Sequence, residues 1–160
     1  MKRLMLLTLA LCPVLAAQQH CTLQQIRGTY AVSYDGWALL PQQGAPLPLT
    51  VPGVIMGVIS IGYDDKLSGA ETVIVAGQAM EYEITGGSVE LNSDCTGTMR
   101  SLARVKGSGQ EPAPIIERFI VLADKDEIRT TALNSPDASV GTMALGIWKR
   151  MSASPNSASW

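Results

Sequence analysis

Hydrophobic and polar residues alternate with a period of two through most of the chain, which is the pattern of β-strands with one buried face. The alternation is cleanest in 78–85, where Met80, Tyr82 and Ile84 share one face and glutamates occupy the other. Gly-rich and Asp-rich turns separate the alternating segments. The predicted strands are 28–38, 53–63, 70–77, 78–85, 86–91, 97–106, 115–124, 127–133 and 141–150.

Two of these segments carry more specific expectations. Residues 53–63 are apolar on both faces, which is typical of a strand that is covered on both sides or faces a partner. The Gly86-Gly87 pair predicts a hairpin turn between 78–85 and the strand that follows. Residues 39–52 contain four prolines and show no period, so we expect a long loop over a barrel mouth or edge.

Eight or nine short strands with almost no helix indicate a β-sandwich or a closed barrel. The connections look sequential, and closure removes exposed sheet edges, so both observations favour the barrel. The sequence therefore predicts an all-β, closed, antiparallel up-and-down barrel of about eight strands. A single helical turn is expected just before Gly28. The interior of such a barrel is either filled by side chains or holds one small ligand.

The N-terminus has the order of a secretory signal peptide: Lys2 and Arg3, an apolar run, then small residues. We expect a signal peptide at 1–17, a barrel domain at 18–151 and a polar, frayed tail at 152–160, in a secreted or periplasmic protein. An uncleaved anchor or a lipoprotein are the alternatives. Without Lys2 and Arg3, ten basic residues face 14 acidic ones. The net charge near −4 argues against nucleic acid and anionic membranes as partners, and no other apolar run predicts a membrane span.

Cys21 and Cys95 remain once the signal peptide is removed, and an oxidising compartment predicts that they form a disulfide. This bridge would tie the N-terminus to the turn before strand 97–106; two free thiols are the alternative. The single histidine, His20, lies at the start of the mature chain. We therefore expect no metal site and no cofactor.

Catalytic signatures are missing from the sequence, which has no Gly-x-Ser-x-Gly, His-Glu-x-x-His or phosphate-binding glycine loop. Glu117 and Arg118 are adjacent in an apolar strand, so one of them points to each face. A charge inside the barrel must be paired or hydrogen-bonded, and it could orient a ligand. The alternative is that the charge lies at the barrel rim in water.

Aromatic and methionine side chains on expected inward faces suggest an apolar cavity, although such residues also simply fill cores. The candidate cavity residues are Tyr30, Tyr34, Met80, Tyr82, Met99, Glu117, Arg118, Phe119 and Trp148.

The segment "LQQIRGTYAV" resembles the start of calycins and lipocalins, in which a helical turn leads into a Gly-x-Trp on the first strand. In that family a basic residue near the end of the last strand packs over the tryptophan. Here the tryptophan is replaced by tyrosine. The allene oxide cyclase barrel is an equally fair comparison by strand count. A Gly-x-Tyr followed by Asp-Cys-Thr-Gly-Thr is also similar to a group of uncharacterised secreted bacterial proteins. The matching positions are Leu23, Ile26, Gly28 and Tyr30, with Lys149 or Arg150 as the basic partner.

The leading functional hypothesis is a secreted barrel that binds a small apolar molecule without catalysis. One alternative, implied by the second resemblance, is a cofactor-free isomerase or cyclase that uses the same cavity. Another is a filled barrel that serves as an envelope or extracellular protein-interaction module. The pattern leaves the oligomeric state undetermined.

Overall fold

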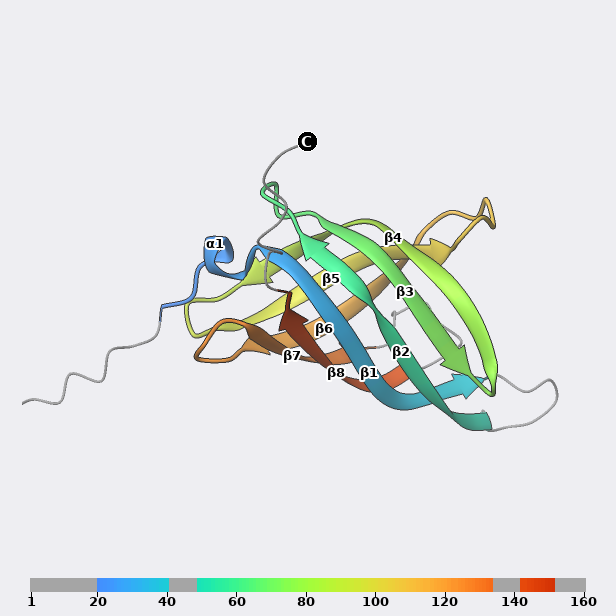
Figure 1. Ribbon diagram of the computed structural model, residues 1–160. Coiled ribbons are helices and arrows are strands. Elements are labelled where there is room, and N and C mark those ends of the chain that lie inside the picture. Colours follow the sequence, from blue (N-terminus) through green and yellow to red (C-terminus); the bar gives the residue numbers. More distant parts are fainter. Residues whose placement is uncertain (1–19, 41–48, 134–141, 152–160) are drawn as a thin grey trace, which may run out of the picture.

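The computed structural model describes residues 20–40, 49–133 and 142–151. Eight antiparallel strands form a closed barrel in which each strand pairs with the next and the last pairs with the first (Figure 1). The predicted fold class is therefore confirmed. The elements are α1 (Leu23–Ile26), β1 (Gly28–Leu40), β2 (Leu49–Ile61), β3 (Leu67–Val75), β4 (Gln78–Leu91), β5 (Thr96–Val105), β6 (Ala113–Val121), β7 (Glu127–Leu133) and β8 (Thr142–Arg150).

One end of the barrel is closed by the short helix α1, which lies beside the start of β1 (Figure 1). Cys21, just before the helix, forms the predicted disulfide with Cys95 in the β4–β5 turn. The Cys21 N–H also donates a hydrogen bond to the Ser93 carbonyl oxygen at 3.3 Å. Ile26 is fully buried and covers the core from this side. The N-terminal segment is thus fastened over the closed end.

Arg150 fastens the same end from the last strand. Its guanidinium lies over the Tyr30 ring, 5.1 Å from the ring centroid, and donates hydrogen bonds to the carbonyl oxygens of Arg27 and Gln25. It also forms an ion pair with Asp126 at 3.0 Å. Of the two basic residues considered, Lys149 and Arg150, it is Arg150 that packs over Tyr30.

Side chains pack the barrel solidly from the closed end to about its middle. These residues lie at alternate positions of the strands, as the period of two requires. Burial at every second position is clearest in β1 and β6, where exposed residues occupy the positions between. The buried apolar residues of this half include Ile26, Tyr30, Val32, Ile59, Ile61, Leu67, Val89, Met99, Phe119, Val121, Ile128 and Trp148.

Strand β4 corrects the prediction of a Gly86-Gly87 hairpin turn. The structure has one continuous strand over 78–91, with a β-bulge where the register against β5 shifts between Ile84 and Gly86. The extra residue moves the inward face from even to odd positions, so Ile84 and Val89 are both buried. Gly86 and Gly87 allow the backbone to bend at the bulge, but the chain does not reverse its direction there.

Strands β1 and β2 are longer than predicted. β1 runs to Leu40 and β2 begins at Leu49, so part of the expected 39–52 loop is strand and the rest lies outside the described residues. The outer face of β2 is apolar and exposed at Val54, Met56 and Val58. Within the described part of the chain, nothing covers this face.

The predicted signal peptide at 1–17 and tail at 152–160 lie outside the described residues. Among the residues that are described, none belongs to a helix long and apolar enough to cross a membrane.

Candidate functional site

Polar side chains meet inside the barrel at about its middle, above the packed half. Tyr34 on β1 is the centre of this group: its hydroxyl donates to Oε2 of Glu117 at 2.7 Å and accepts the indole N–H of Trp148 at 2.6 Å. The Thr130 hydroxyl donates to the same Glu117 oxygen at 2.7 Å. All four residues are buried. Strands β1, β6, β7 and β8 therefore build one continuous hydrogen-bonded chain.

Two inward glycines make room for this polar layer. A Cβ on Gly146 would lie 2.4 Å from the Tyr34 ring and 2.7 Å from the Thr130 hydroxyl oxygen. A Cβ on Gly57 would lie 2.8 Å from Cγ of Glu71. All three distances are far below ordinary van der Waals contact, so each glycine allows a larger side chain of a neighbouring strand to lie against the barrel wall.

Glu71, on β3, is the second carboxyl group inside the barrel. It is 7% exposed and accepts no hydrogen bond from any described residue. No fully buried side-chain oxygen of the described residues lacks a partner. The Glu71 oxygens therefore keep some exposed surface. Ser101, on β5, is also buried, and its hydroxyl forms no hydrogen bond with a described residue.

Burial raises the pKa of both carboxyls. For Glu71, burial and then the charge of Glu117 raise the pKa to about 7. For Glu117, burial raises the pKa although hydrogen bonds from Thr130 and Tyr34 oppose the shift. Burial, followed by the charges of Glu117 and Glu71, also raises the pKa of Tyr34. The two glutamates interact electrostatically, and each holds a proton to a higher pH than an ordinary glutamate does.

A cavity of about 70 Å³ lies at the open end of the barrel, above this polar layer. Tyr34 contributes to its lining and joins it to the polar layer, while Glu71 lies two residues below the lining residue Val73 on the same strand face. Most of the remaining lining is small or aliphatic, from Gly36, Ala38, Gly53, Ile55, Val75 and Ala144. We call this mostly apolar cavity the funnel; neither carboxyl is among its lining residues, and Tyr34 connects it to Glu117.

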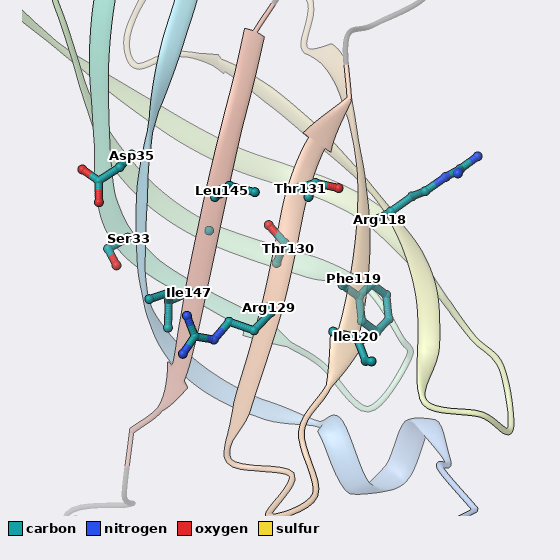
Figure 2. A pocket seen from close by; sticks show the side chains of 11 residues that line it. Ser33, Asp35, Arg118, Phe119, Ile120, Arg129, Thr130, Thr131, Leu145 and Ile147 are labelled. Atoms are coloured by element: carbon teal, nitrogen blue, oxygen red, sulfur yellow. The ribbon is translucent and has the colours of Figure 1, made fainter.

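A larger hollow, of about 590 Å³, lies on the outer surface across β1, β8, β7 and β6. Figure 2 shows Asp35, Leu145, Arg129 and Arg118 set along these four strands. This hollow is wide and open to solvent. Neither buried carboxyl is among the residues that line either space, but Tyr34, which is hydrogen-bonded to Glu117, lines the inner cavity. Because the perturbed ionisable groups are inside the barrel, we take the smaller inner cavity as the functional candidate.

The predicted cavity residues separate into three groups. Glu117 points inward and Arg118 is exposed outside, which settles the alternative left open by their adjacency. Tyr34, Glu117 and Trp148 form the polar layer, with Tyr82 half-buried at the position paired with Glu71. Met80, which is 36% exposed, belongs with Arg118 to the group of exposed residues. The third group of predicted cavity residues, which fills the closed half of the barrel, consists of Tyr30, Met99 and Phe119.

Sequence reasoning missed Glu71. The segment 70–77 is apolar at both odd and even positions, so its alternation does not show which face is inward. A signal was nevertheless present: Leu67, Val73 and Val75 have the same parity as Glu71. That parity places the glutamate on the face of the large apolar residues.

No protein-family model matches the chain, and no curated protein sequence is significantly similar to it. Among the described residues, no group of three or more Asp, Glu, His or Cys side chains could hold a metal ion.

Proposed function

We propose that this protein binds a small amphiphilic molecule in the open half of its barrel, without transforming it. The apolar part of the molecule would lie in the funnel, and its polar end would reach the layer that contains Tyr34, Glu71 and Glu117. The observation that carries this proposal is Glu71: a buried carboxyl that accepts no hydrogen bond from the described residues and lies two residues from the cavity-lining Val73 on the same strand face. A core that served packing alone would gain stability from an apolar residue there.

The other properties of the chain support a role outside the cytoplasm. The N-terminal pattern predicts export, and a disulfide such as Cys21–Cys95 persists in oxidising compartments. A calycin-like barrel that is closed at one end and open at the other suits the capture of a small molecule from the surrounding medium. We therefore include secretion or periplasmic residence in the proposal.

The test uses three six-carbon probes that differ only in the polar end: hexan-1-ol, hexylamine and hexanoate. Binding to the folded, oxidised protein is measured by ligand-observed NMR and by calorimetry. Ala144→Met places a longer side chain in the cavity and is expected to reduce binding of any bound probe at least tenfold. Ala70→Met is the matched control, because Ala70 is an exposed alanine on the outer face. If no probe binds, or if both variants bind as the wild type does, the proposal is wrong.

The pair of buried carboxyls also favours a second function, the acid–base isomerisation implied by the comparison with allene oxide cyclase. A carboxyl with a pKa near 7 can both take and return a proton near neutral pH. The probe is hexan-2-one in deuterated buffer. Faster exchange of its α-protons with the wild type than with Glu71→Gln would favour the enzyme, and equal rates would exclude this role for Glu71.

The third hypothesis, a protein-interaction module, rests on the exposed apolar outer face of β2 at Val54, Met56 and Val58. It stays a prediction.

A further inference from the structure

We infer that the polar end of the bound molecule is a protonated amine, held between Glu71 and Glu117, with a short apolar substituent directed through the funnel to the open end. This inference rests on the proposed function and adds to it the chemical class of the ligand.

The first argument is the balance of charge inside the barrel. Two carboxyls lie there. Burial raises the pKa of both, the charge of Glu117 further raises the pKa of Glu71, and no basic residue lowers the pKa of either one. The described arginines and lysines lie at the surface or in ion pairs near the strand ends, as Arg150 does with Asp126 and Arg104 with Glu83. A carboxylate pair in a low-dielectric interior must either hold a proton or receive a cation from outside.

The second argument is the count of acceptor atoms. Both protein donors to Glu117, Tyr34 and Thr130, bond the same oxygen, Oε2. Oε1 of Glu117 and both oxygens of Glu71 receive no hydrogen bond from the described residues. A primary ammonium carries three N–H donors and no acceptor, so it matches three free acceptor oxygens. An alcohol offers a single donor, and a carboxylate offers none.

The third argument is the lining and the volume of the cavity through which the ligand would enter. Aliphatic side chains line the way from the open end, among them Ile55, Val73 and Ala144. A hydrated metal ion would have to lose its water along this route, and hard cations require six or more oxygen ligands. The cavity of about 70 Å³ has room for several heavy atoms, since about 10–15 Å³ of such space holds one water. An alkyl ammonium ion fits both the lining and the volume.

The inference is tested with the same probes by calorimetry at pH 8. We expect hexylamine to bind at least tenfold more tightly than hexan-1-ol, and hexanoate to bind least. Glu71→Gln keeps the size of the side chain and removes its charge. It is expected to abolish the preference for the amine while hexan-1-ol still binds. Glu90→Gln, an exposed position on β4, is the control and should behave as the wild type.

The pH profile gives an independent readout. The titratable side chains at inward positions around Glu71 are Tyr34 on β1, Tyr82 on β4 and Glu117 on β6. The Glu71 carboxyl must lose its proton to bind a cation, so hexylamine affinity should rise about tenfold per pH unit from pH 5 to 7 and then level off. The affinity of hexan-1-ol should not rise with pH.

The outcomes separate this inference from the proposed function. If hexan-1-ol binds as tightly as hexylamine, and Ala144→Met blocks both, the barrel is a binding protein but its ligand is not a cation. If no probe binds, both proposals are wrong. If Glu71→Gln does not fold, two measurements on the wild type still test whether the ligand is a cation. These are its relative affinities for hexylamine, hexan-1-ol and hexanoate, and the pH profile of hexylamine binding.

Discussion

At the scale of single residues, the two inward glutamates differ in their hydrogen bonding. Glu117 is held by Tyr34 and Thr130, while Glu71 has no hydrogen-bond donor among the described residues. In the proposed function, Glu117 would therefore be a fixed part of the barrel wall and Glu71 the group that a ligand contacts. Both are costly to bury in the charged form, and this cost makes the stability of the protein depend on pH.

Stability should therefore fall from pH 5 to pH 8. The pKa of Glu71 is raised from 4.5 to about 7 in the folded state, so the folded protein binds more protons than the unfolded chain in this window. Its contribution is fully present below pH 4.5 and is lost as the pH rises through 7, by up to about 3 kcal/mol. Glu117 shifts stability in the same direction. Urea unfolding of the unliganded protein across this range measures the effect.

The control is Glu71→Gln, which should reduce this dependence and leave the part that comes from Glu117. Asp64 and Asp94 have lowered pKa values and act in the opposite direction, but only in more acidic solution, so they do not enter the window. A wild-type stability that is constant or that rises from pH 5 to pH 8 would contradict the assignment.

Tyr34→Phe should destabilise the protein by about 1–3 kcal/mol. The substitution leaves the buried Trp148 indole N–H without its acceptor and removes a donor from Glu117. Chemical unfolding followed by tryptophan fluorescence gives the free energy. Tyr63→Phe is the matched control, because Tyr63 is 90% exposed and should change stability by less than about 0.5 kcal/mol. Equal effects of the two substitutions would show that the inner network contributes nothing.

At the scale of elements, alternation revealed the strands but not the irregularities within them. Met99 is buried, as its candidacy for the interior requires. The adjacency of Glu117 and Arg118 predicted that one of them faces inward without deciding which, and the structure shows that it is Glu117. The bulge in β4 was misread as a turn, because two glycines suit both and only the pairing with β5 distinguishes them. Glu71 was missed because β3 is apolar on both faces.

Two glycines of β2 offer a test of how closely the strands pack around the site. A Cβ at Gly57 would lie 2.4 Å from the backbone oxygen of Ala70, so Gly57→Ala must push β2 away from β3. We expect a loss of about 1–3 kcal/mol and weaker binding of hexylamine, since Glu71 moves with β3. At Gly53, on the same face, the nearest atom is a side-chain carbon of Val75 at 3.4 Å. Gly53→Ala should therefore change unfolding by less than about 0.5 kcal/mol, and an equal loss at both positions would disprove the steric explanation.

At the scale of the whole molecule, the features that stabilise the fold and those proposed to bind a ligand lie in different parts of the barrel. The closed end carries α1 (Figure 1), the Cys21–Cys95 disulfide and the Arg150 contacts, and buried apolar side chains form the core beneath them. The open end carries small residues and the cavity, and the carboxyl pair lies between the two ends, at about the middle of the barrel. Stability and binding should accordingly respond to different perturbations, although both depend on one continuous sheet.

Reduction of the disulfide tests this division. The bridge joins residues 74 positions apart, and the chain-entropy model gives a loop of this length at most about 4 kcal/mol of stabilisation. We expect the reduced protein, and the double variant Cys21→Ser/Cys95→Ser, to unfold at a lower temperature. Below that temperature the affinity for hexylamine should stay within about twofold of the oxidised protein, because Glu71 and the cavity lie beyond the packed half of the barrel. The indole N–H resonance of Trp148 reports the polar layer directly and should not move. A loss of affinity in parallel with the loss of stability would mean that the two ends are coupled, and that the N-terminal cap belongs to the binding mechanism as well as to the fold.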